Sequence, residues 1–230
     1  MTPRTGGAVQ KAVRLSIDEL LEGARGVPPA ERDEMAVPSY CHWNPAIRWL
    51  FWRRLDVALD AASLGPDETV LDFGCGSGVL LPSLCQDGRR VMATDLVVGP
   101  AEAMIRRRSL AVELVPARAF NEWAASRSGT LDCILALDVL EHLEGDALPE
   151  VLSAFAGLLR AGGHLIVSGP TETFLYKIGR MIAGFVGDYH HRTIFDIDRE
   201  LRRTWARGEA MFVPGRPLPR AFLVARYARN

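Results

Sequence analysis

The chain has 230 residues, 48% of them hydrophobic and 24% charged, with a formal net charge of -1. This length and apolar content suffice for one buried core and exclude a wholly disordered chain. The balance of charge argues against bulk nucleic acid as a partner, since such binding needs an excess of positive charge. No apolar stretch approaches the roughly 20 residues of a membrane span, so we expect a cytoplasmic protein with no transmembrane segment.

The spacing of the four cysteines fits neither a CxxC zinc pattern nor the dense disulfide framework of a small secreted domain. We therefore expect reduced thiols at all four positions. They are Cys41, Cys75, Cys85 and Cys133.

The first 44 residues differ in composition from the remainder of the chain. They mix glycine, proline and charged residues, and only residues 13–21 have a helical apolar spacing. This predicts an N-terminal arm, residues 1–44, that is partly disordered or helical. In residues 45–62 apolar positions recur every three or four residues, which predicts an amphipathic helix. We expect this helix to open a single domain over residues 45–230.

Short apolar runs then alternate with segments of helical character. The runs that have the length of buried strands are residues 69–73, 90–94, 111–115, 131–137 and 164–168. The segments that favour helices are residues 79–87, 100–108 and 148–160. Such alternation predicts a parallel sheet with helices on both faces.

The last third of the chain has a different pattern. Residues 197–205 predict a charged amphipathic helix, and residues 211–213 and 221–227 predict the two strands of a hairpin. The whole pattern predicts an α/β fold, a Rossmann-like three-layer sandwich. Its sheet would have about seven strands, mostly parallel, with an antiparallel C-terminal hairpin at one edge.

A glycine-rich turn follows the first expected strand. Gly74, Gly76 and Gly78 form a GxGxG pattern where an open parallel sheet places its ligand crevice. Glycines there let backbone N–H groups approach a ligand without obstruction by a Cβ. The dinucleotide fingerprint GxGxxG would need glycine at position 79, where the chain has Val79. NAD binding is therefore the less favoured interpretation.

Asp95 ends the second expected strand. A carboxylate at that place accepts hydrogen bonds from both hydroxyls of a ribose, as nucleoside-binding sheets require. The alternative is that Asp95 caps the helix that follows.

Four motifs in this order are similar to those of a known family. They are residues 70–80 with the glycine turn, Asp95, the LDVLEHL run of residues 137–143, and the LRAGGHLIVS run of residues 159–168. With these motifs the chain resembles the class I S-adenosylmethionine-dependent methyltransferases. The resemblance is strongest to the small-molecule branch of the ubiquinone and menaquinone pathways, and it extends from about residue 45 to the end.

The resemblance implies S-adenosylmethionine as cofactor and S-adenosylhomocysteine as product. It places the methionine moiety near the glycine turn, the ribose at Asp95 and the adenine on Leu96. Many relatives carry Gly-Asp-Ala after the third strand, where this chain has Arg118 in place of the acidic residue. The cofactor-binding residues that it implies are Asp72, Gly74, Cys75, Gly76, Gly78, Asp95, Leu96, Ala119, Leu137 and Asp138.

Asp138, Glu141 and His142 follow the fourth strand, so they should face the same crevice. If the segment is helical, Asp138 shares a face with Glu141 or with His142. In one interpretation these side chains only start a helix and orient the backbone and the cofactor. In a second, His142 is the base that deprotonates the acceptor.

A third interpretation adds the histidine pair at positions 190 and 191. A DxxEH motif with a later histidine resembles the metal site of certain ubiquinone O-methyltransferases, which carry Glu where Asp138 stands. Asp138, Glu141, His142 and His190 would then hold Mg²⁺, Mn²⁺ or Zn²⁺ against an acceptor hydroxyl. We favour a site without metal. The candidate catalytic residues are His142, His190 and His191.

Residues 171–192 lie where relatives insert elements that cover the acceptor. Their apolar bulk, interrupted by Lys177 and Arg180, favours a lid over an apolar or amphipathic small molecule. The alternatives are packing on the core and contact with a membrane surface.

The function expected from these observations is methyl transfer to a small-molecule acceptor, preferably to a hydroxyl oxygen. C- or N-methylation, an NAD-type oxidoreductase and a non-catalytic cofactor-binding module are the alternatives. We expect a monomer or a homodimer.

Overall fold

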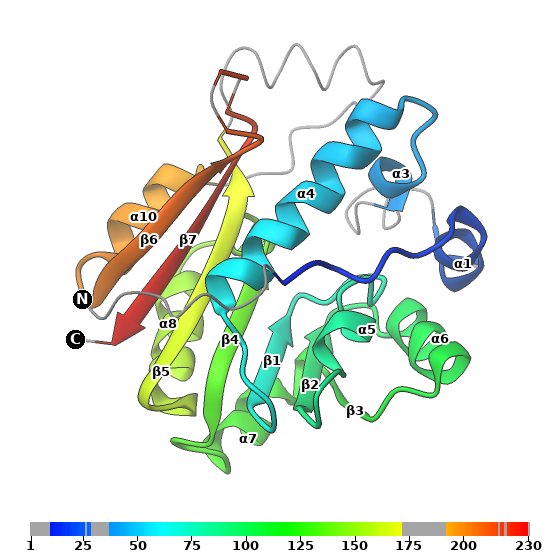
Figure 1. The fold of residues 1–230 in the computed structure, drawn as a ribbon. Helices are drawn as coiled ribbons and strands as arrows, with labels where there is room; N and C mark the ends of the chain where they lie inside the picture. The colour runs from blue at the N-terminus through cyan, green and yellow to red at the C-terminus, as the bar shows by residue number, and fades with distance from the viewer. Residues whose placement is uncertain are drawn as a thin grey trace.

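The computed structural model describes residues 10–25, 27–28, 37–171, 192–215, 217–218 and 220–229. Its centre is a seven-stranded sheet (Figure 1). The strands are β1 (Thr69–Phe73), β2 (Arg90–Asp95), β3 (Val112–Pro116), β4 (Leu131–Leu137), β5 (Leu159–Pro170), β6 (Trp205–Val213) and β7 (Phe222–Arg229).

The strand order is β3-β2-β1-β4-β5-β7-β6. The first five strands run parallel, and β7 is antiparallel to both β5 and β6. The predicted fold class is therefore confirmed. Because the chain reverses its direction of winding between β1 and β4, the ligand crevice of such a sheet lies beyond the carboxyl ends of these two strands.

Helices cover both faces of the sheet, and each face has its own apolar core (Figure 1). The helices on one face are α4 (Pro45–Ala62), α5 (Leu81–Leu84) and α6 (Gly99–Arg108). Those on the other are α7 (Phe120–Ala125), α8 (Ala147–Leu158) and α10 (Ile194–Leu201). Two short 3-10 turns, η1 (Ala117–Ala119) and η2 (Leu140–His142), follow β3 and precede α8. None of the described helices is long and apolar enough to cross a membrane.

The described part of residues 1–44 packs on the domain. It contains α1 (Ile17–Gly23) and α3 (Val37–Tyr40), and the buried side chains of Leu20 and Tyr40 belong to the same apolar cluster as α4. The boundary at residue 44 stays a prediction.

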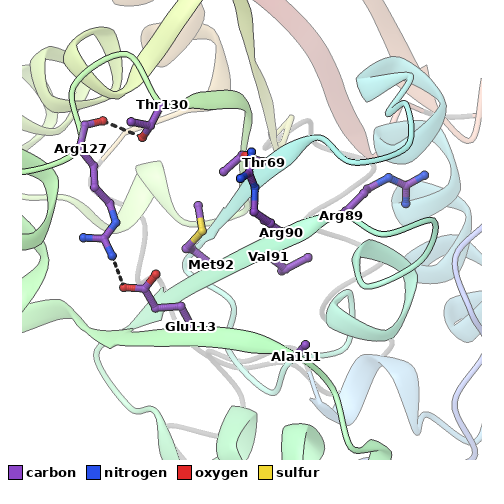
Figure 2. Close-up of a pocket in the computed structure, with 9 residues that line it drawn as sticks. All are labelled: Thr69, Arg89, Arg90, Val91, Met92, Ala111, Glu113, Arg127 and Thr130. Atoms are coloured by element: carbon purple, nitrogen blue, oxygen red, sulfur yellow. Dashed lines mark hydrogen bonds and ion pairs between the residues drawn. The ribbon is translucent and has the colours of Figure 1, made fainter.

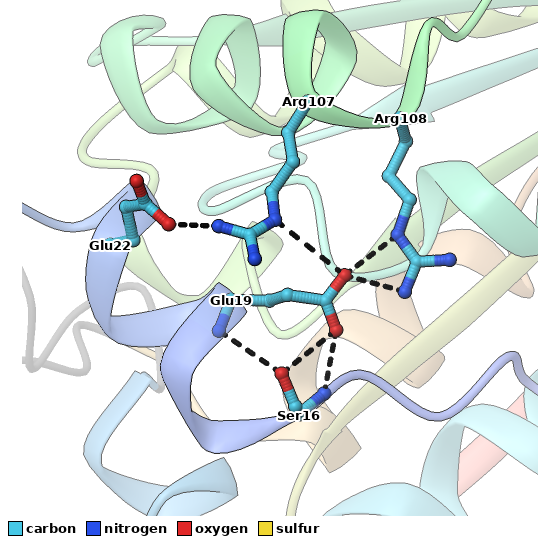
Figure 3. Close-up of polar contacts among 5 residues, drawn as sticks. All are labelled: Ser16, Glu19, Glu22, Arg107 and Arg108. Carbon is cyan, nitrogen blue, oxygen red and sulfur yellow. Dashed lines mark hydrogen bonds and ion pairs between the residues drawn. The ribbon is translucent and has the colours of Figure 1, made fainter.

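A charged cluster joins α1 to α6 (Figure 3). Ser16 caps α1, and its backbone N–H donates to the Glu19 carboxylate at 2.9 Å. The other carboxylate oxygen of Glu19 lies 2.6 Å from the guanidinium of Arg108, and Glu22 forms an ion pair with Arg107. The hydrogen bond from the Ser16 backbone is the largest of the causes that lower the pKa of Glu19, and the Ser16 side chain and Arg108 lower it further. The cluster therefore holds the N-terminal helix on the helix that follows β2.

Side-chain hydrogen bonds are made at both ends of helix α4. The Asn44 side chain accepts a hydrogen bond from the Ala46 N–H at 2.9 Å, which caps the amino end. At the carboxyl end Nε2 of His164 lies 2.9 Å from the carbonyl oxygen of Ala62. Burial, followed by the nearby positive charge of Arg226, lowers the pKa of His164 to about 4. The imidazole is consequently neutral at pH 7 and donates to that carbonyl.

Several predicted boundaries were wrong. The predicted helix over residues 148–160 ends at Leu158, and Gly162 and Gly163 lie at a register shift within β5. The predicted helix over residues 79–87 contains only Leu81–Leu84. The predicted helix over residues 197–205 ends at Leu201.

Strand β6 is longer than expected, Trp205–Val213 instead of 211–213, and α7 is an additional helix. Residues 206–210 of β6 are exposed and carry no apolar run that would reveal a strand, so their backbone pairing with β7 defines this part of β6.

Candidate functional site

The glycine turn after β1 has the backbone conformation that only glycine adopts readily. Gly74, Gly76 and Gly78 have φ values of 76°, 52° and 71°. The N–H groups of Gly74 and Cys75 both donate to the carbonyl oxygen of Thr94, at 2.9 and 3.1 Å. The turn is thereby tied to the end of β2, at the carboxyl edge of the sheet.

Asp95 lies at the end of β2, beside the turn. Its Oδ2 accepts the N–H of Gly76 at 2.7 Å, and its Oδ1 accepts the N–H of Val97 at 3.0 Å. The alternative that Asp95 caps α6 is wrong, because the capping residue is Val98 and no side chain bonds there. The neighbouring residue Leu96 is 88% exposed. Its apolar side chain is therefore accessible to a ligand beside the carboxylate of Asp95.

Asp72 is a second carboxylate on the same face of the sheet, near the end of β1. The residue is only 4% exposed. Burial first, and then the charge of Asp95, raise the pKa of Asp72 from its ordinary value of 3.8 to about 7. Burial and these two carboxylates also raise the pKa of the Cys75 thiol. The arrangement concentrates negative potential beside the turn, which favours a cationic ligand.

Asp138, directly after β4, is held by three contacts. Its N–H donates to the Ser168 carbonyl oxygen at 2.9 Å, and the Ser168 hydroxyl donates to Oδ1 at 2.6 Å. Its Oδ2 forms an ion pair with the buried guanidinium of Arg54 on α4. With φ of 55°, Asp138 does not begin a helix, and only the η2 turn follows. The condition under which Asp138 would share a helical face with Glu141 or His142 is therefore not met.

Arg54 is a site residue that the sequence analysis missed. It falls within the apolar stripe of α4, on the same face as Leu50 and Ala58. An arginine inside such a stripe was the available signal, because a buried guanidinium requires a partner.

The described residues of the proposed metal set do not assemble a cation site. Asp138 already faces a guanidinium, Glu141 is 1% exposed and His142 is half-buried. His190 and His191 lie outside the described residues. Within the described ranges no group of three His, Cys, Asp or Glu side chains is placed to hold a metal ion.

The remaining expected cofactor residues line the same edge. Leu137 ends β4 and Ala119 ends η1, and both are half-buried. Arg118, in place of the acidic residue of many relatives, is exposed.

The residues at this edge of the sheet fall within a match to a family of known proteins. The family model described as "Methyltransferase domain" matches residues 47–212. The chain belongs to this methyltransferase family. The matched range includes most of α4, the glycine turn, Asp95 and Asp138, which the structure places together.

Curated relatives of this methyltransferase include the ubiquinone biosynthesis O-methyltransferase of Vibrio parahaemolyticus. It is 32% identical over 117 residues, 50% of this chain and 49% of the relative. The protein of the same name from Cronobacter sakazakii is 34% identical over 103 residues, 44% and 42% of the two chains. The matched region spans about half the length of these relatives.

Solved structures share the fold. The N-methyltransferase NodS from Bradyrhizobium japonicum, in complex with S-adenosyl-L-homocysteine, has a TM-score of 0.65 at 18% identity, over 87% of this chain and 96% of that one. The 1,6-didemethyltoxoflavin-N1-methyltransferase of Burkholderia thailandensis has a TM-score of 0.59 at 20% identity, over 95% and 92%.

A separate cavity of about 660 Å³ lies at the opposite edge of the methyltransferase sheet, at the amino ends of the strands (Figure 2). Its arginines are engaged with their neighbours. Arg127 donates to Glu113 at 2.7 Å, and Arg90 donates to the Thr69 hydroxyl at 3.1 Å. None of the expected site residues lines this cavity.

Proposed function

We propose that this chain transfers the methyl group of S-adenosylmethionine to a hydroxyl oxygen of a small-molecule acceptor. The observation that carries the proposal is the pair of carboxylates, Asp72 and Asp95, beside a turn with three positive-φ glycines. That combination suits a ligand with a ribose and a positive charge. The structural neighbour with bound S-adenosyl-L-homocysteine and the curated O-methyltransferases support it.

Each part of the cofactor has a partner at this edge. Asp95, fixed by two backbone N–H groups, would accept the ribose hydroxyls. The exposed Leu96 would pack on the adenine, with Ala119 beside it. Asp72 would become charged when a cation lies against it, because an opposite charge lowers a raised carboxyl pKa.

When bound, S-adenosylmethionine supplies a methyl carbon already activated by its sulfonium. The chain's own contribution is to align the acceptor, exclude water and accept a proton. We assign proton removal to His142, in η2 and four residues after Asp138, with His190 and His191 as alternatives. An imidazole titrates near neutral pH and suits this step.

Oxygen is the acceptor atom that the curated relatives favour, since the Vibrio and Cronobacter proteins are named O-methyltransferases. An acceptor-side lid at residues 171–192, an apolar or amphipathic acceptor, and a monomer or homodimer remain part of the proposal.

Two measurements test it. Calorimetry should detect binding of S-adenosylhomocysteine, and absence of binding would reject the cofactor assignment. Methyl-labelled S-adenosylmethionine is then incubated with a panel of phenols, catechols, amines and activated methylenes. We expect label on a phenolic or catecholic oxygen, and label confined to nitrogen or carbon would reject the oxygen assignment.

The role of His142 is tested on the acceptor so identified. His142→Gln should lower kcat about 10²-fold or more, the usual contribution of a general base, while the affinity for S-adenosylhomocysteine changes little. It should also remove the acidic limb of the pH–rate profile. A profile with that limb unchanged would transfer the role to another residue.

A further inference from the structure

Asp138 is firmly held in a left-handed backbone conformation. A non-glycine residue with φ of 55° is uncommon, and such conformations persist where surrounding contacts over-determine them. Here the contacts are the two hydrogen bonds with Ser168, which is fully buried, and the ion pair with Arg54. They act on both the backbone and the carboxylate, so the direction of the Asp138 side chain is fixed from one strand, β5, and one helix, α4.

Burying the charged guanidinium of Arg54 costs free energy. It is 4% exposed, and its guanidinium lies 5.3 Å from the Phe51 ring and 5.1 Å from the Phe222 ring. Its Nη2 donates to the Tyr40 hydroxyl at 2.8 Å, but the buried Nε has no hydrogen-bond partner among the described residues. Replacing a buried ion pair by apolar side chains is often neutral or stabilising. Stability alone does not explain this arginine.

Val139 links the contact between Arg54 and Asp138 to the glycine turn. Val139, next to Asp138, packs on Gly74, and a Cβ at position 74 would lie 2.4 Å from Cγ2 of Val139. The position of the loop after β4 and the position of the glycine turn therefore depend on each other. Both stand at the switch point between β1 and β4, where the ligand crevice lies.

We propose that Arg54 is a positioning residue of the methyl-transfer site, which acts through Asp138 to hold the loop after β4 against the glycine turn. This inference rests on the proposed function. Because Tyr40 shares the same guanidinium, Arg54 also ties the N-terminal segment to that loop. Arg54 supplies a fixed positive charge beside Asp138, built into the fold.

The test compares variants of two arginines, Arg54 in α4 and Arg14, which contacts α4 from the N-terminal segment. Arg54→Met removes the guanidinium from Asp138 but keeps an apolar side chain of similar length. Arg14→Met is the matched control, because Arg14 forms an ion pair with Asp56 of the same helix at 2.7 Å. Hydrogen–deuterium exchange of the amides of residues 138–142 is measured without ligand, and calorimetry gives the affinity for S-adenosylhomocysteine.

We expect faster exchange in residues 138–142 and about ten-fold weaker binding for Arg54→Met, and neither change for Arg14→Met. On an identified acceptor, kcat should fall more than KM rises, by up to about 10²-fold, as for a small misplacement at a reacting centre. Exchange in Arg54→Met equal to that in Arg14→Met would overturn the proposal, whether or not the ligand binds. Absence of binding in the unmodified protein would instead refute the proposed function.

Two further variants apply if Arg54→Met does not fold. Ser168→Ala removes only the hydroxyl that donates to Asp138, so it should speed exchange in the same residues without an unpaired charge. Arg54→Lys keeps the charge, but its single ammonium cannot reproduce the planar contacts to Tyr40 and Asp138. We expect intermediate exchange and affinity for Arg54→Lys, and full recovery of neither. Protection of residues 138–142 unchanged in both variants would contradict the inference.

Discussion

Val139 occupies the space in which a side chain at Gly74 would have to lie. An ideal Cβ on Gly74 would be 2.4 Å from Cγ2 and 2.6 Å from Cβ of Val139. Gly74 also has φ of 76°, so both sterics and backbone conformation require glycine there. The loop after β4 and the turn after β1 are therefore in direct contact at the crevice.

Gly74→Ala should lower the melting temperature and abolish detectable binding of S-adenosylhomocysteine. The left-handed conformation alone costs about 1–2 kcal/mol for an L-residue, and the contact with Val139 adds to it. Adding Val139→Ala to this variant should restore part of the stability, because it removes the clash but not the strain. Gly157→Ala is the control, since a Cβ at Gly157 in α8 meets nothing within 4 Å, and it should stabilise slightly. Normal binding in Gly74→Ala would contradict this account of the turn.

Asp72→Asn should stabilise the ligand-free protein at pH 8 relative to the unmodified protein. The pKa of Asp72 is raised to about 7 in the folded state, so the folded state holds this proton more tightly than the unfolded state. Stability contributed by Asp72 is present below pH 3.8 and falls as pH rises to about 7. The advantage of Asn should grow over this window, at up to about 1.4 kcal/mol per pKa unit, and level off above it.

Denaturant titrations at pH 4, 6 and 8 measure this difference. His164, whose pKa is lowered to about 4, contributes a slope of the opposite sign between pH 4 and 6.5, but it is present in both proteins and cancels. A constant difference across the three pH values would show that Asp72 is not the titrating group. Asp72→Asn should also bind S-adenosylmethionine, a cation, more weakly at pH 8.

Asp95→Ala should weaken binding of S-adenosylhomocysteine by about 100-fold or more. The variant would lose the two charge-assisted hydrogen bonds that we propose Asp95 accepts from the ribose, each worth about 1.5–3 kcal/mol. It also frees the N–H groups of Gly76 and Val97. Glu102→Ala, an exposed carboxylate in the first turn of α6, is the control and should bind normally. Calorimetry decides between them, and equal affinities would remove Asp95 from the cofactor site.

Glu19→Gln should loosen the contact between α1 and α6 with only a small loss of global stability. Ion pairs of this kind, near the surface, are worth about 0.2–1 kcal/mol. The variant also loses the charge that the Ser16 N–H and Arg108 stabilise. Limited proteolysis should show faster cleavage near residue 20, and in the unmodified protein salt should have a similar effect. Glu22→Gln, whose carboxylate makes fewer contacts, is the comparison, and identical cleavage in all three proteins would contradict the role of the cluster.

The sequence alone located the elements whose signals are local. The ranges of α4, β1 and β4 agree with the predicted ones at both ends. Each buried strand is a short apolar run, and α4 has its cap, its proline and its apolar stripe within a few residues of one another. The positive φ of the glycine turn and the place of Asp95 at the end of β2 likewise follow from neighbouring residues.

The tertiary structure decided whatever depends on partners far apart in the chain. Strand β6 exists through its pairing with β7, because its own side chains are mostly exposed. The conformation of Asp138 depends on Ser168 and Arg54, which lie 30 residues after it and 84 before it. Periodicity reports which face of an element is buried, but it carries no information about which distant charge a buried charge meets. The packing of α4 on β5 and β7 brings these three residues together.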